Sequence, residues 1–253
     1  MSDVTQRFTD RVGNYVRYRP GYPPALIEAL RERAGLTSTS VVADVGAGTG
    51  IFTALLLPVC GHVYAVEPND AMRAEAETRF RGEPKFESLA APAEAIPLPD
   101  SSVDLVTAAQ AFHWFDPPRA RREFVRLLRP GGGIGLVWNE RESDTTPFLR
   151  DYEGVLQRHG TDYAYVSHRH LDEARIAAFF APMPVEIVAV PNEQRFDLEG
   201  LIGRALSSSY APNLGHPDHA AFVKDLGRIF ERHATDGRVA FRYQARLYFG
   251  RVV

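Results

Sequence analysis

An apolar run followed by three glycines at alternating positions is the feature that most constrains how this chain can fold. Residues 41–45 read Val-Val-Ala-Asp-Val, and Gly46, Gly48 and Gly50 follow them. The run predicts a buried strand interrupted by one acid, Asp44. The glycines predict a tight turn into a helix, because glycine has no Cβ and tolerates positive φ. In α/β sheets such a turn lies where nucleotide-like ligands bind.

The spacing of these glycines separates several ligand classes. Dinucleotide-binding loops read Gly-x-Gly-x-x-Gly, whereas here the third glycine comes one residue earlier and is followed by Ile51. A Lys-Ser or Lys-Thr pair does not follow Gly50, which excludes a phosphate-cradling P-loop. The stretch resembles the first motif of the class I S-adenosylmethionine-dependent methyltransferases. That resemblance implies a site for S-adenosyl-L-methionine lined by Asp44, Gly46, Ala47, Gly48 and Gly50, while an ordinary strand-to-helix turn is the alternative.

Composition bounds the size of the fold and the kind of partner. The 253 residues, 45% of them hydrophobic, suffice for one elaborated α/β domain or a domain with a cap. A net charge of −3 with both signs mixed creates no global field for nucleic acid or an anionic membrane. The single cysteine, Cys60, excludes an internal disulfide and fits a reducing compartment. Because no signal peptide or long apolar run is evident, we expect a cytoplasmic protein without a membrane span.

Residues 1–24 carry aromatic side chains and an arginine on a segment that prolines keep from forming a helix interior. A helix is expected from about Pro24 to Ala34. Aromatic rings and a guanidinium suit a ligand that has both a cation and a carboxylate, as S-adenosylmethionine does. The segment resembles the Tyr-x-x-x-Arg-Pro-x-Tyr-Pro pattern of the type 11 small-molecule methyltransferase group, matched by Tyr15, Arg19, Pro20, Tyr22 and Pro23. The resemblance implies cofactor contacts for Tyr15 and Arg19.

An acid ends the second expected strand, within residues 61–68. Glu67 lies 21 residues after Gly46, the distance at which a second-strand carboxylate reaches a ribose diol in the doubly wound fold. Because a carboxylate accepts hydrogen bonds from two vicinal hydroxyls, we expect Glu67 to bind ribose, with Pro68 beside it. A strand-end or helix-capping acid is the alternative interpretation.

A proline-rich loop follows the third expected strand, residues 86–89. It resembles the adenine-side loop of the same methyltransferases, in which a small residue and an acid precede the prolines, matched by Ala93 and Glu94. Family members often carry an aspartate one or two positions earlier, where this chain has Ala91 and Pro92. The resemblance implies that Ala93 and Glu94 bind adenine, and an exposed loop acid is the alternative for Glu94.

An aromatic run leaves the end of the fourth expected strand, residues 104–109. It reads Gln-Ala-Phe-His-Trp-Phe from Gln110 and resembles a run found after strand four in the type 11 group. The resemblance implies that Gln110 contacts the methionine end of the cofactor and that His113 and Trp114 face the methyl acceptor. His113 is the candidate catalytic base for a hydroxyl, thiol or carbon acceptor, whereas a carboxylate acceptor needs no base. A packed histidine is the alternative.

Five β/α units in order predict an α/β fold of the Rossmann-like, doubly wound type. We expect a mostly parallel seven-stranded sheet with one antiparallel strand, plus a helical cap inserted late in the chain. Residues 1–35 are expected to form an arm and helix that cover the cofactor site, residues 36–140 the S-adenosylmethionine-binding core, and residues 141–253 the cap, the acceptor region and the closing strands. Two histidine pairs, at 168 and 170 and at 216 and 219, lack further ligands at matching spacing, so we expect no metal site.

The sequence thus predicts an S-adenosylmethionine-dependent methyltransferase that acts on a small-molecule metabolite by in-line methyl transfer, in which positioning supplies most of the rate. A non-catalytic S-adenosylmethionine-binding protein and a nicotinamide-dependent oxidoreductase are the alternatives, and the glycine spacing argues against the second. A nucleic-acid substrate is not expected. The acceptor, the methylated atom and the choice between monomer and homodimer stay open.

Overall fold

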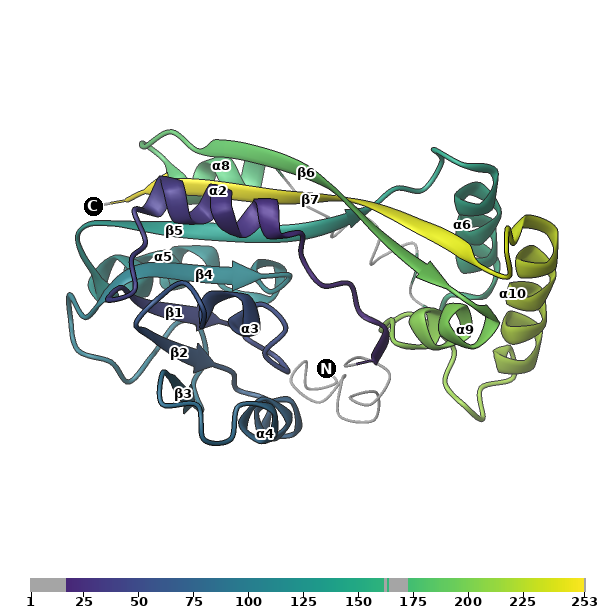
Figure 1. Cartoon of the computed structure of the whole chain (residues 1–253), viewed down its shortest axis with the longest axis horizontal. Coiled ribbons are helices and arrows are strands. Elements are labelled where there is room, and N and C mark those ends of the chain that lie inside the picture. Colours follow the sequence, from purple (N-terminus) through teal and green to yellow (C-terminus); the bar gives the residue numbers. More distant parts are fainter. Residues whose placement is uncertain (1–16, 162, 164–172, 253) are drawn as a thin grey trace.

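The computed structural model describes residues 17–161, 163 and 173–252. It consists of a sheet flanked by helices and a helical cap at one end of the long strands (Figure 1). Tyr15 and the histidines at 168 and 170, for which the sequence analysis makes predictions, lie outside the described residues. In the described ranges, none of the helices combines the length and the apolar character that crossing a bilayer demands.

A seven-stranded sheet in the order β3-β2-β1-β4-β5-β7-β6 forms the centre of the protein. Strands β1 to β5 are parallel, and β7 pairs antiparallel with both β5 and β6. The predicted Rossmann-like fold is thereby confirmed, and the strand order reverses between β1 and β4, the switch point at which such sheets bind ligands. The strands are β1 (Val41–Val45), β2 (His62–Val66), β3 (Phe86–Leu89), β4 (Val103–Ala109), β5 (Leu128–Arg141), β6 (Glu186–Phe196) and β7 (Val239–Arg251).

Helices begin where the sequence offers prolines or capping side chains. Pro24, Pro117 and Pro147 stand in the first turns of their helices, and Asn69 and Asp197 accept hydrogen bonds from backbone N–H groups at the starts of theirs. The expected helix from Pro24 to Ala34 is present as α2. The helices are α2 (Pro24–Ala34), α3 (Thr53–Leu56), α4 (Asp70–Arg79), α5 (Pro117–Leu127), α6 (Pro147–His159), α8 (Glu173–Phe180), α9 (Leu198–Leu206) and α10 (His219–His233), with a 3-10 turn, η3 (Phe112–Trp114).

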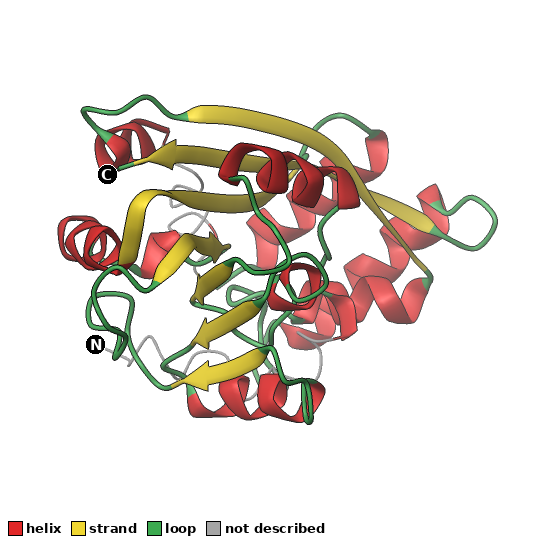
Figure 2. Cartoon of the chain, turned by 60° about the vertical axis from the view of Figure 1, so that its left-hand side comes forward, coloured by secondary structure: helices red, strands yellow, loops and turns green. Residues whose placement is uncertain are grey.

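Helices cover both faces of the sheet (Figure 2). One face packs Phe112, Phe124 and Trp138 into its core, and the other packs residues of α2 and α3 such as Leu30 and Leu56. Helix α2 lies on the long strands β5 to β7 (Figure 1). The segment before this helix, residues 19–22, reaches the carboxyl ends of the parallel strands.

Strands β6 and β7 run beyond the parallel strands and carry the cap, in which α6, α9 and α10 enclose a separate core that includes Tyr152, Phe222 and Phe241 (Figure 1). The sequence predicts a strand over residues 185–190. The structure continues the strand to Phe196, since β6 is the edge of the sheet, where a proline does not remove a necessary ladder hydrogen bond.

Candidate functional site

Asp44 links three elements beneath the glycine loop. Its side chain is buried, Oδ1 accepts a hydrogen bond from Thr107 Oγ1 at 2.9 Å, and Oδ2 accepts one from Thr53 Oγ1 at 2.6 Å. These bonds join the end of β1 to β4 and to the start of α3. Burial raises the pKa of Asp44 to about 6, against the hydrogen bonds of the two threonines. Asp44 therefore fixes the base of the loop and also borders the pocket above it.

The three glycines adopt positive φ angles of 70°, 58° and 77°. A Cβ at Gly46 would lie 2.4 Å from Ala111 Cβ, and one at Gly50 would lie 2.4 Å from the Phe80 ring. A Cβ at Gly48 would meet only Met72 Sδ, at 3.7 Å. Gly46 and Gly50 are therefore needed for packing as well as for conformation, whereas Gly48 leaves its space open for a ligand.

Glu67 fastens the glycine loop to the end of β2. The residue is 8% exposed, Oε2 accepts a hydrogen bond from Gly48 N at 2.9 Å, and Oε1 accepts one from Asn69 N at 2.8 Å. Burial raises the pKa of Glu67, and the two backbone donors and Arg73 oppose the shift. Each carboxylate oxygen has a second lone pair, so the structural role is compatible with the predicted ribose contact. Pro68 follows and is exposed.

The adenine-side candidates lie on the loop before β4. Ala93 is buried, and Glu94 Oε1 accepts a hydrogen bond from Asp116 N at 2.8 Å. Asp116 in turn caps α5, because its side chain accepts a hydrogen bond from Arg119 N. Glu94 therefore steadies the start of α5, and the adenine contacts of Ala93 and Glu94 stay predictions.

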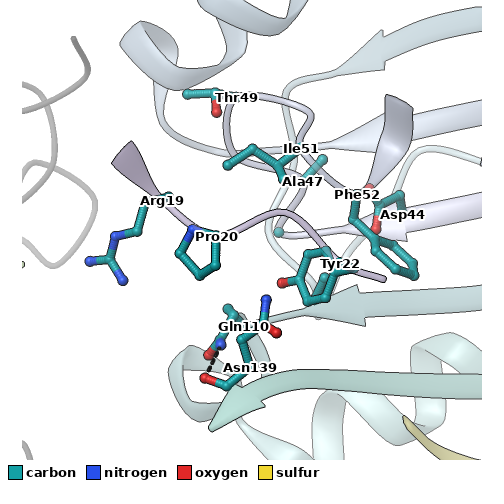
Figure 3. Close-up of a pocket in the computed structure, with 12 residues that line it drawn as sticks. Arg19, Pro20, Tyr22, Asp44, Ala47, Thr49, Ile51, Phe52, Gln110 and Asn139 are labelled. Atoms are coloured by element: carbon teal, nitrogen blue, oxygen red, sulfur yellow. Dashed lines mark hydrogen bonds between the residues drawn. The ribbon is translucent and has the colours of Figure 1, made fainter. Parts of the chain in front are cut away.

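A pocket opens above the loop, between the arm that precedes α2 and the ends of β4 and β5 (Figure 3). Five predicted site residues border it: Arg19, Asp44, Gly46, Ala47 and Gln110. The other lining residues are Pro20, Tyr22, Thr49, Ile51, Phe52, Ala109 and Asn139. Figure 3 shows the arm residues lying between the glycine loop and the end of β5. The remaining described candidates, Gly48, Gly50, Glu67, Pro68, Ala93, Glu94 and His113, lie outside this lining set.

Gln110 and Asn139 form the lower wall of the pocket. Gln110 has a φ of 57°, unusual for a residue with a side chain, and its Nε2 donates to the Asn139 carbonyl at 3.0 Å (Figure 3). Sequence reasoning missed Asn139, although a polar residue directly after the apolar run 134–138 is a signal for a strand-end site. Asn139 Nδ2 donates to the Gly21 carbonyl at 3.0 Å, and its Oδ1 accepts from Asn192 at 2.9 Å. Asn139 thus holds the arm against β5.

Thr49 supplies a test of whether the pocket suits a polar ligand. Its Oγ1 is buried and makes no hydrogen bond to another described residue. A buried hydroxyl without a partner is costly, and a ligand with a polar group at this position would satisfy it. The open space at Gly48 lies one residue away. Both observations fit a polar ligand such as the amino acid and ribose parts of S-adenosylmethionine.

His113 lies in the turn η3 that leaves β4. Its ring centre is 4.5 Å from that of Trp114 and 6.2 Å from that of Trp138, so the imidazole packs among aromatic rings. Its predicted role as a base stays a prediction. His216 Nδ1 accepts a hydrogen bond from Asp218 N, and His219 Nδ1 forms one with the Pro212 carbonyl oxygen. The described ranges hold no group of three or more histidine, cysteine, aspartate or glutamate side chains that could bind a metal ion.

Comparisons with known proteins agree with the fold. Residues 43–135 match a family described as methyltransferase domain. The chain is 41% identical over 158 residues to an uncharacterized methyltransferase of Mycobacterium tuberculosis, covering 62% of each chain. It is 37% identical over 158 residues to an uncharacterized methyltransferase-like protein of Schizosaccharomyces pombe, covering 61% of this chain and 59% of that one. The match thus spans about three-fifths of these relatives.

Among solved structures, a protein from Anaeromyxobacter dehalogenans, named as a candidate type II methyltransferase, superposes with a TM-score of 0.69. The superposition covers 93% of this chain and 99% of that one at 23% sequence identity. Because the identity is low, this likeness concerns the fold alone.

Proposed function

We propose that this chain, which carries a methyltransferase domain of the matched family in residues 43–135, transfers a methyl group from S-adenosyl-L-methionine to a small-molecule acceptor. The observation that carries the proposal is the pocket above the glycine loop, which joins Asp44, Gly46 and Gln110 to the arm residue Arg19. The unpaired hydroxyl of Thr49 beside this loop supports a polar ligand there.

In this proposal the methionine end of the cofactor lies in the described pocket, where Arg19 provides positive charge and Gln110 and Thr49 provide hydrogen bonds. Glu67 binds the ribose hydroxyls, and the loop at Ala93 and Glu94 borders the adenine. The Arg19 guanidinium binds the carboxylate of the cofactor in this proposal.

The bound cofactor supplies an electrophilic methyl group on a positively charged sulfur. The chain contributes placement and exclusion of water, which can supply a large part of the rate without a nucleophilic side chain. Aromatic faces stabilise a nearby cation, and Tyr22 and Phe52 border the pocket with ring centres 5.1 Å apart. His113 accepts a proton where the acceptor is a hydroxyl, thiol or activated carbon.

Calorimetric titration with S-adenosylhomocysteine tests the cofactor, and transfer of a labelled methyl group into a metabolite extract tests turnover. Binding together with a labelled product supports the proposal. Binding of S-adenosylhomocysteine without any labelled product favours a non-catalytic binding protein. A rise in melting temperature with NAD and none with S-adenosylhomocysteine favours a nicotinamide-dependent oxidoreductase instead.

We also propose that the protein works in the cytoplasm. Cys60, the single cysteine of the sequence, is buried, and its Sγ donates to the Leu56 carbonyl. Burial raises its pKa to about 11, so the thiol is not reactive. Fractionation of cells followed by immunodetection tests the location, and recovery in the membrane pellet would contradict it.

A further inference from the structure

Arg204, in α9, is a buried cation without an acidic partner in the described part of the chain. The residue is 5% exposed, and none of the ion pairs of the described residues includes it. Its Nε donates to Tyr243 Oη at 3.2 Å and its Nη1 donates to Ser208 Oγ at 3.2 Å. A buried charge that lacks a counter-charge is costly and is seldom retained without a function.

The phenol of the neighbouring Tyr152 does not supply that counter-charge. Burial is the main cause that raises the pKa of Tyr152, so this phenol stays neutral near neutral pH. A second arginine, the half-buried Arg141 at the end of β5, pairs with Glu153, and its Nη2 also donates a hydrogen bond to the Tyr163 hydroxyl. Among these side chains there are thus two guanidinium groups and one carboxylate, which leaves one positive charge unbalanced.

One end of the Arg204 guanidinium has no hydrogen-bond partner among the described residues. Nη2 donates to none of them, and the residue keeps 5% of its surface exposed. A planar guanidinium with one side held by Tyr243 and Ser208 and one nitrogen free is prepared to bind a carboxylate.

Arg204 is connected to the pocket residue Arg19 along two routes. On the first, Arg19 Nη2 donates to the Ser207 carbonyl at 3.0 Å, and Ser207 Oγ donates to the Arg204 carbonyl at 2.7 Å. On the second, Tyr243 Oη donates to Gln194 Oε1 at 3.0 Å, and Gln194 Nε2 donates to the Tyr18 carbonyl at 3.4 Å. The start of the described arm accordingly lies beside α9 (Figure 1). The two guanidinium groups thus belong to one network that joins the pocket to the cap.

We propose that Arg204 binds a carboxylate of the methyl acceptor, and that the acceptor is therefore a small organic acid that extends from the pocket toward α9. The inference rests on the proposed methyltransferase function and names the substrate class of the same site. The anchoring carboxylate balances the charge of Arg204, while a second group of the acceptor lies near the methionine end of the pocket. This group takes the methyl group as the bond between the methyl carbon and the cofactor sulfur breaks, and S-adenosylhomocysteine is the leaving group.

Labelled-methyl transfer with the full chain tests this inference. The probes are saturated dicarboxylic acids and hydroxy acids of increasing chain length. Each diacid is compared with its singly charged monoamide, and each hydroxy acid with its neutral amide. We expect one of the acids to be methylated, and kcat/KM for its amide to be lower by about 10- to 100-fold, because the amide loses a charge-assisted hydrogen bond.

Variants of Arg204 separate acceptor binding from cofactor binding. We expect Arg204→Gln to raise KM for the accepted acid by about 10- to 100-fold, with kcat and the affinity for S-adenosylhomocysteine little changed. Arg204→Lys, which keeps the charge, should restore part of the affinity. The matched control is Arg228→Gln, because Arg228 is an exposed residue of α10 in the same cap and pairs with Asp225 at the surface.

Two results would overturn the inference while leaving the proposed function in place: methylation of non-acidic acceptors only, or an unchanged KM for the acid in Arg204→Gln. Failure to bind S-adenosylhomocysteine would instead overturn the proposed function. If Arg204→Gln does not fold, Tyr243→Phe tests the inference instead. This variant removes the hydroxyl that accepts a hydrogen bond from Arg204 Nε but keeps the aromatic ring of residue 243. A KM for the acid that stays at the wild-type value in this variant contradicts the inference, and a raised KM supports it.

Discussion

The Gly48 backbone N–H donates a hydrogen bond to Glu67 Oε2 across 2.9 Å, so the acid at the end of β2 holds the middle of the glycine loop. The loop and the acid are 19 residues apart in the sequence, and the parallel pairing of β1 with β2 brings their ends together. Because the same carboxylate is the predicted ribose ligand, loop conformation and ligand binding depend on one side chain. This dependence leads to the first prediction.

Glu67→Gln is expected to weaken the affinity for S-adenosylhomocysteine by about tenfold or more and to lower the free energy of unfolding by about 1–3 kcal/mol. An amide presents one oxygen, and its NH₂ group faces a backbone N–H that the carboxylate satisfies. Calorimetry and urea unfolding measure the two effects. Glu87→Gln, on the edge strand β3, is the control and should change neither, since Glu87 is exposed. Wild-type affinity in Glu67→Gln would remove the ribose assignment.

Alanine at Gly46 and at Gly48 should have different effects. A Cβ at Gly46 collides with Ala111 Cβ at 2.4 Å and also meets a positive φ, so we expect Gly46→Ala to cost roughly 3 kcal/mol or more of stability. Gly48→Ala meets no close atom, so we expect only about 1 kcal/mol from the backbone but a clear loss of S-adenosylhomocysteine affinity. Urea unfolding and calorimetry compare the variants, and equal stability losses would contradict the packing argument.

The raised pKa of Asp44 predicts a pH dependence of stability. Its pKa is about 6 in the folded protein and 3.8 as a model group, so the folded state binds the proton more tightly than the unfolded chain does. The contribution of Asp44 is therefore greatest below pH 4 and is lost as the pH rises through about 6, by roughly 3 kcal/mol. Subtracting the unfolding free energies of Asp44→Asn from those of the wild type at each pH isolates this slope. A flat difference would show that the carboxylate ionises normally.

The sequence predicted the core of the fold and much of the pocket because local signals coincide there. The alternating glycines, the acid of β2 and the strand-end residue Gln110 each follow a short apolar run, and parallel strands place such ends along one edge. The cap was harder, because its arrangement depends on contacts between distant segments. In the sequence Arg204 resembles an exposed basic residue of an amphipathic helix. Only the structure shows that it is buried and that it donates a hydrogen bond to Tyr243 of β7.

Asn139 was missed although it follows the apolar run 134–138, because its hydrogen bonds join segments that are distant in the sequence, and it provides the last prediction. Its amide joins β5 to the Gly21 carbonyl and to Asn192, so it holds the arm whose residues Arg19 and Tyr22 border the pocket. We expect Asn139→Ala to lower stability by about 1–3 kcal/mol, because buried polar groups lose their partners, and to weaken S-adenosylhomocysteine binding several-fold as the arm loosens.

Asn192→Ala is the matched control for Asn139→Ala. Asn192 Nδ2 donates to the same Gly21 carbonyl at 2.9 Å, but this residue lies on the edge strand β6 and does not border the pocket. It should therefore weaken ligand binding less than Asn139→Ala does. Hydrogen exchange of the backbone amides of residues 17–22 reports directly on the arm, and we expect faster exchange in Asn139→Ala. If exchange and ligand affinity both stay at wild-type values in this variant, Asn139 does not hold the arm in place.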